Sequence, residues 1–94
     1  MLYLIKIRKQ LKNELNLNRN FTRTEKRYIK IWVKKYKYNI DTILLAFHYT
    51  LNKDNPNFAY IHCLLSDWYK RNLLTKSEVI KWIDYMKIKY VHKL

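Results

Sequence analysis

The stretch that decides the fold is Tyr60-Ile61-His62-Cys63-Leu64-Leu65-Ser66-Asp67-Trp68. On a helix, its first, fifth and ninth residues fall on one stripe, because side chains four positions apart lie above one another. Ile61 and Leu65 widen the apolar face beyond a narrow stripe. A face of this width is typical of a largely buried helix, which we expect over about residues 57–71.

Turn and cap signals bound this helix on both sides. The preceding cluster Asn52-Lys53-Asp54-Asn55-Pro56-Asn57 predicts a turn, with proline as the helix breaker. Asn72 is well placed to adopt the left-handed conformation that ends a helix. Thr75-Lys76-Ser77-Glu78 is a capping box, in which a hydroxyl and a carboxylate satisfy amides at a helix start. It predicts a further helix, whose apolar residues recur as far as Tyr90.

The N-terminal half predicts three more helices. Apolar residues recur at helical spacing over about residues 2–17. Thr22-Arg23-Thr24-Glu25 is another capping box, and Asn39 is the expected left-handed end of the helix that it starts. Asp41 is the expected N-cap of the next helix. The fold class is therefore expected to be all-α, a compact bundle of about five helices in a single domain over residues 1–94.

Composition supports this class and indicates a cytoplasmic protein. The chain has no glycine and one proline, whereas all-β folds lean on glycine in their turns. The single cysteine, Cys63, cannot form an internal disulfide, which fits a reducing compartment. The first nine residues place apolar side chains before basic ones, which is the reverse of a signal peptide, and the apolar run is too short to span a membrane.

The net charge of +13 points to a polyanionic partner. Residues 1–37 carry +10 and residues 70–94 carry +5, while residues 38–69 carry −2. If the two basic ends meet in space, they form one basic face. The alternative is an ordinary solvated surface that is rich in lysine. Net charge gives information about binding partners and solubility but not about the fold.

The residues that carry chemistry do not assemble into an enzyme site. His62 and Cys63 are adjacent, so on a helix they point about 100° apart and cannot act as a nucleophile and its base. His48, His62 and His92 lack the spacing of metal ligands. Without glycine there is no phosphate-cradling loop. We therefore expect no catalytic activity, no metal and no cofactor.

Basic and aromatic side chains remain as candidates for binding nucleic acid. If the basic ends converge, the expected phosphate contacts come from Lys30, Lys34, Lys70, Arg71 and Lys81. Exposed tyrosines can stack on unpaired bases; the candidates are Tyr36, Tyr38, Tyr69, Tyr85 and Tyr90. Tryptophans at core-type spacing are more often core than base platforms; they are Trp32, Trp68 and Trp82.

The sequence resembles a known family, the DnaD-like domain of primosomal initiation proteins from low-GC Gram-positive bacteria and their phages. The first part of the family pattern is matched by Arg19, Phe21, Thr22, Glu25, Ile29 and Trp32. An Ile-x-x-Ala pattern follows from Ile43 to Ala46. The family's Tyr-Ile-x-x-Ile-Leu-x-x-Trp stretch is matched by Tyr60, Ile61, Leu64, Leu65 and Trp68. The matches cover about residues 19–80.

The resemblance implies a helical domain that binds single- or double-stranded DNA with little sequence preference, during replication initiation or primosome assembly. It also implies that Tyr60, Leu64, Trp68 and the basic residues after them take part. Within that stripe, Leu64 and Trp68 are expected to be chiefly structural and Tyr60 to lie nearer DNA. The alternative is a protein-interaction module that docks an initiator or helicase loader, with charge only assisting. RNA binding is less favoured, because no RNA-module signature is present.

Overall fold

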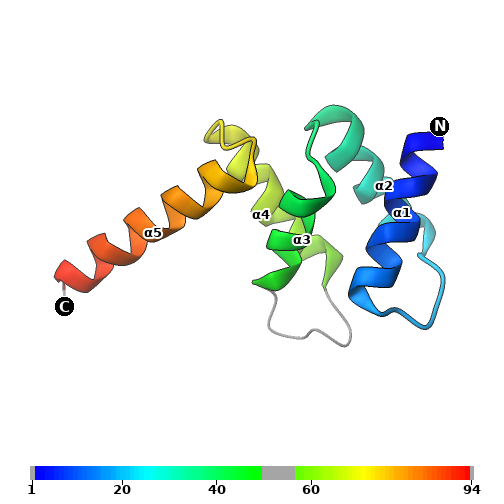
Figure 1. Ribbon diagram of the computed structural model, residues 1–94, viewed down its shortest axis with the longest axis horizontal. Coiled ribbons are helices and arrows are strands. Elements are labelled where there is room, and N and C mark those ends of the chain that lie inside the picture. The colour runs from blue at the N-terminus through cyan, green and yellow to red at the C-terminus, as the bar shows by residue number, and fades with distance from the viewer. Residues whose placement is uncertain (1, 50–56, 94) are drawn as a thin grey trace.

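The computed structural model describes residues 2–49 and 57–93, and this part of the chain is helical with no strand. The elements are α1 (Leu2–Leu15), α2 (Arg23–Lys30), the π-helix η1 (Ile31–Lys35), α3 (Ile40–His48), α4 (Phe58–Lys70) and α5 (Lys76–Lys93). The predicted all-α class with five helices is confirmed, with η1 continuing directly from α2 (Figure 1). Within the two described ranges, no helix combines the length and the apolar character needed to cross a bilayer.

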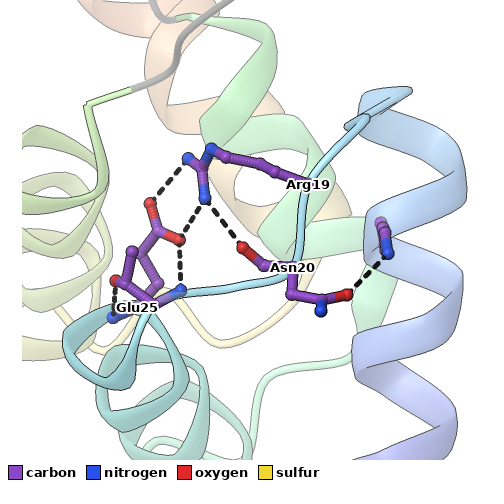
Figure 2. Close-up of polar contacts among 5 residues, drawn as sticks. Arg19, Asn20 and Glu25 are labelled. Atoms are coloured by element: carbon purple, nitrogen blue, oxygen red, sulfur yellow. Dashed lines mark hydrogen bonds and ion pairs between the residues drawn. The ribbon is translucent and has the colours of Figure 1, made fainter.

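The loop before α2 is fastened to that helix by the predicted capping box. The Thr22 hydroxyl accepts the Glu25 N–H at 3.1 Å, and the Glu25 carboxylate accepts the Thr22 N–H at 2.9 Å. The Arg19 guanidinium donates to both carboxylate oxygens of Glu25, at 2.7 and 2.9 Å, and to the backbone oxygen of Asn20 (Figure 2). These bonds, the one from Arg19 foremost, hold the pKa of Glu25 below its usual value.

Three helix ends are closed by a residue in the left-handed conformation. Asn16 ends α1 with φ 56° and Asn72 follows α4 with φ 62°. After α4, the Leu73 N–H bonds the Trp68 oxygen at 2.8 Å and the Asn72 N–H bonds the Tyr69 oxygen at 3.0 Å, which is the Schellman pattern. The predicted role of Asn72 is thereby confirmed.

The end of η1 differs from the prediction. The left-handed residue there is Lys37, with φ 62°, and the Tyr38 N–H reaches back six residues to the Trp32 oxygen. Asn39 is extended, with φ −78° and ψ 162°, and it is the N-cap of α3, so its prediction as the left-handed end is wrong. Asp41 lies in the first turn of α3 and is not its N-cap. Because the reversal is completed at Lys37, α3 begins earlier than the cap signal at Asp41 suggests.

The start of α5 resembles the predicted capping box. The Thr75 hydroxyl accepts the Glu78 N–H at 3.2 Å and donates to the Glu78 carboxylate at 2.9 Å. The turn cluster predicted before α4 lies outside the described residues except for Asn57. The Asn57 side chain accepts the Tyr60 N–H at 3.1 Å and caps α4.

The hydrophobic core gathers around Trp32, which is fully buried. Its ring lies 6.0 Å from the ring of Phe47 on α3 and 6.0 Å from that of Phe58 on α4. Leu4, Ile7 and Leu11 of α1 are buried in the same cluster, as the spacing in the sequence predicts. The core residues of α4 are Phe58, Ile61, Leu65 and Trp68. α5 contributes Val79 to the core and then extends away from the other helices, at the end of the molecule opposite α1 (Figure 1).

Candidate nucleic-acid interface

A row of aromatic rings runs along the contact between α2–η1 and α4. The ring of Tyr28 stacks on His62 with 4.8 Å between centroids, and the ring of Tyr36 lies 6.2 Å from His62 at an interplanar angle of 10°. Tyr36 in turn stacks on Tyr69 at 4.3 Å. We call these four residues the aromatic row. Tyr69, at the end of α4, is its most exposed member, with 40% of its surface accessible.

Polar contacts fix the middle of the aromatic row. The indole Nε1–H of Trp32 donates to His62 Nδ1 at 3.0 Å, which leaves the imidazole proton on Nε2, 3.5 Å from Ser66 Oγ. Ser66 Oγ and the Tyr36 hydroxyl share a hydrogen bond of 2.9 Å. These contacts hold the imidazole and the Tyr36 ring in defined orientations.

The same contacts favour the neutral form of His62. Burial lowers its pKa, and the positive charge of Lys35 lowers it further. A proton on Nδ1 would also point at the indole N–H, so the imidazolium fits this network poorly. His62 is therefore a fixed, neutral part of the aromatic row at neutral pH.

Exposed basic side chains flank the aromatic row. Lys35 precedes Tyr36 and Lys70 follows Tyr69 in the sequence, and both lysines are exposed. Residues 23–37 contain seven lysines or arginines and one acid, Glu25, whose charge is paired with Arg19. The helical segment that carries Tyr28 and Tyr36 is therefore strongly positive, which suits a polyanion.

Tyr60, Leu64 and Arg71 do not belong to the aromatic row. Tyr60 is 46% exposed and Leu64 is partly buried. The Arg71 Nε–H donates to the Asp67 carboxylate at 2.9 Å, and its guanidinium lies 4.9 Å from the centre of the Trp82 ring of α5. The polar and tyrosine contacts with α2–η1 come instead from His62, Ser66 and Tyr69. α4 thus presents two separate surfaces, and Arg71 belongs to the one that faces α5.

The remaining predicted phosphate contacts are spread over the molecule. Lys30 is exposed on α2, and Lys34 lines a pocket together with Tyr3 of α1. Lys81 is exposed on α5. α1 and α5 lie at opposite ends of the molecule, so the basic side chains of these two helices are apart (Figure 1). Lys35 and Lys70, one from each basic end of the sequence, instead adjoin the stacked pair Tyr36 and Tyr69.

Among the tyrosines expected to stack on bases, Tyr38 is enclosed instead. It is 1% exposed, and its hydroxyl donates to the backbone oxygens of Leu65, at 3.3 Å, and Leu73, at 2.8 Å. Burial raises its pKa well above the usual value. Tyr38 therefore ties the end of η1 to the end of α4.

Sequence reasoning missed the parts that His62, Ser66 and Lys35 play in this surface. A lone histidine in an apolar helix is ordinarily a packing residue, and its partner Trp32 lies thirty positions away in the sequence. A weak signal was present in the spacing of Tyr28, Trp32 and Tyr36, which recur every four residues. That spacing places three aromatic rings on adjoining parts of one helix surface.

These observations define an all-α domain with a basic, aromatic surface. Across the described part of the chain, no three His, Cys, Asp or Glu side chains come together as a potential metal site. A family model described as replication initiation and membrane attachment (DnaB_2) matches residues 9–83. The chain belongs to this family, the DnaD-like domain family, as the resemblance in the sequence predicted. No curated protein and no solved structure gives a significant match.

Membership supports a general role in replication initiation. Most residues of the matching pattern maintain the fold. Arg19 and Glu25 fasten a loop, while Ile29, Trp32 and Trp68 lie in the core. In the stretch from Tyr60 to Trp68, the tyrosine is the half-exposed member of the matched set.

Proposed function

We propose that this chain binds DNA without sequence specificity during replication initiation or primosome assembly. The observation that carries the proposal is the stacked pair Tyr36–Tyr69, with 4.3 Å between ring centroids, next to the exposed Lys35 and Lys70. An aromatic platform beside ammonium groups is the combination that binds an unpaired strand through its bases and phosphates.

Fixed rings make this surface suited to stacking. The Tyr36 hydroxyl is held by Ser66, and its ring lies between His62 and Tyr69, so little side-chain freedom is lost when a base stacks on the row. Stacking on an aromatic ring contributes about 1–3 kcal/mol per base and tolerates every base. Ammonium groups add attraction to phosphates that is equally independent of sequence.

Tyr60 is a second contact in the proposal, from the other surface of α4. It is the accessible member of the predicted stripe, since Trp68 is 2% exposed and Leu64 is partly buried. We assign Leu64 and Trp68 to the support of α4 and Tyr60 to the contact with DNA. The proposal includes no catalytic step.

Fluorescence anisotropy with labelled single-stranded DNA tests the role of the aromatic row. Tyr69→Leu removes the exposed ring and should weaken binding about tenfold. Tyr69→Phe keeps the ring and should restore most of the affinity. If the leucine variant binds as tightly as the parent, the aromatic row is not the binding surface.

Charge at the end of α4 is tested by Lys70→Gln, with Lys9→Gln on α1 as the matched control. Losing one phosphate contact should lower the slope of log affinity against log salt by about one, equally for unrelated sequences. The control should leave that slope unchanged, because Lys9 is exposed on α1, which contributes no residue to the aromatic row. Equal effects from both variants would indicate a diffuse charge effect in place of this site.

A protein-interaction module remains the second candidate. The observation that favours it is the exposure of apolar side chains on α4, on the turn that follows it and on α5: Tyr60, Leu74, Ile80 and Tyr85. A packed protein interface of this kind depends weakly on salt, whereas phosphate binding falls steeply as salt rises. Binding to a replication protein that persists in Leu74→Ser would count against this candidate.

A further inference from the structure

A pocket lies apart from the aromatic row, where α1 meets the turn between η1 and α3. Its volume is about 310 Å³, and its lining residues are Tyr3, Val33, Lys34, Lys37, Tyr38 and Asn39. The volume is comparable to that of a small organic ligand. Neither the predicted DNA contacts of α4 nor the aromatic row contributes to it.

The lining of the pocket is positive. Two of the lining residues, Lys34 and Lys37, carry an ammonium group, and none carries a carboxylate. Among the residues that the structure describes, neither lysine has an ion-pair partner. Two uncompensated ammonium groups at one concave site favour an anion with more than one charge.

Lys37 holds a backbone conformation that lysine does not favour. Its φ is 62°, and the other left-handed positions of the described chain are filled by Asn16 and Asn72. Asparagine tolerates this conformation through its short side chain, whereas a long side chain gains nothing from it locally. A lysine at this turn therefore carries a conformational free-energy cost. A binding role for its ammonium group at the pocket would explain why lysine occupies this position.

The start of α3 contributes Asn39 to the site, and its first turn combines a helix N-terminus with the carboxylate of Asp41. Asn39 is the N-cap of this helix, and its side chain makes no capping hydrogen bond. Backbone N–H groups in the first turn of a helix carry partial positive charge toward the N-terminus. Asp41, in the same turn, accepts the Thr42 N–H through its carboxylate at 3.0 Å.

We propose that this pocket binds a phosphomonoester carried by a nucleotide-sized group. A phosphomonoester has a charge of about −1.5 to −2 at neutral pH, which two lysines complement better than they do a single phosphodiester charge. The phenol ring of Tyr3 is 52% exposed at the pocket and offers a surface on which a base stacks. The phosphomonoester comes either from a free nucleotide or from the 5′ end of a DNA strand.

The test compares a 5′-phosphorylated oligonucleotide with the same oligonucleotide ending in a 5′-hydroxyl, together with calorimetric titration of thymidine 5′-monophosphate. Lys37→Asn removes the charge but keeps a residue that accepts φ near 62°, as Asn16 and Asn72 do. Lys34→Gln removes the second ammonium group. Lys26→Gln, on the exposed side of α2 and outside the pocket, is the matched control.

For the parent, the 5′-phosphate should raise affinity about tenfold, or the monophosphate should bind on its own. Lys37→Asn and Lys34→Gln should each remove most of that gain while melting like the parent, and Lys26→Gln should keep it. Competition by the monophosphate identifies a free nucleotide as the source, and preference without competition identifies the DNA end.

Two results would overturn the pocket assignment. The first is a parent that neither prefers the 5′-phosphate nor binds the monophosphate. The second is a loss in Lys26→Gln equal to that in Lys37→Asn. If DNA binds equally well with either 5′ end and the monophosphate does not bind, the function proposed above stands and the pocket assignment falls. If the monophosphate binds and DNA does not, the pocket assignment stands and the proposed function falls.

Discussion

Truncating Trp68 should strongly destabilise the domain and should not merely remove a DNA contact. The side chain of Trp68 projects from α4 into the hydrophobic core and is 2% exposed. Replacing a buried tryptophan by alanine lowers the free energy of unfolding by about 3–5 kcal/mol. A domain of this size has a free energy of unfolding of about 5–14 kcal/mol, so the loss is a large share of it. The expected fall in Tm is roughly 12–40 °C.

Tyr60→Ala is the comparison that separates a contact from a core residue. Tyr60 is 46% exposed, so its replacement should change stability by about 0.5 kcal/mol or less while weakening DNA binding. Circular dichroism melts measured beside anisotropy titrations, at a temperature where each variant is folded, give both quantities. If Trp68→Ala melts like the parent and still fails to bind DNA, Trp68 is itself a stacking platform and this reasoning is refuted.

The other stability predictions concern single polar networks. Burial and the charge of Lys35 lower the pKa of His62 in the folded state. The contribution of His62 to the free energy of unfolding is therefore present above pH 6.5 and is lost as pH falls through the lower, folded-state pKa. Urea unfolding between about pH 5 and pH 8 should show this loss, and His62→Gln should flatten that part of the profile. Thr22→Ala should cost about 1 kcal/mol in thermal melts, since it removes the cap of α2, and an unchanged Tm would contradict that role. Tyr38→Phe should cost about 1–3 kcal/mol in urea unfolding, because it removes the donor to Leu65 and Leu73; a cost no larger than that of Tyr85→Phe, an exposed site, would argue against it.

Local signals in the sequence were sufficient for the helices and most of their ends. The capping box at Thr22 and the left-handed residue Asn72 act through neighbours within six positions, so a short stretch determines them. The turn after η1 was not predictable in this way. Its position depends on the wider π-helical turn, and Lys37 adopts a conformation that residue preference assigns to asparagine or glycine.

The candidate site was harder to predict because its parts are distant in the sequence. The expected division of the α4 stripe is found, with Tyr60 exposed and Trp68 buried, but the second surface of α4, which packs against α2–η1, was not predicted. Periodicity shows that a helix has an apolar face but does not show which edge of that face a neighbour leaves open. The bond from Trp32 to His62 joins residues thirty positions apart and leaves no local signal.

The most direct test of the proposed function is the salt dependence of binding to two labelled single strands of unrelated sequence. We expect binding at low salt with similar affinity for both strands, and a linear fall of log affinity with log salt at a slope steeper than about −1. A marked preference for one sequence would contradict non-specific recognition. Absence of binding at low salt, with the domain shown to be folded, would contradict the proposal that this surface binds DNA.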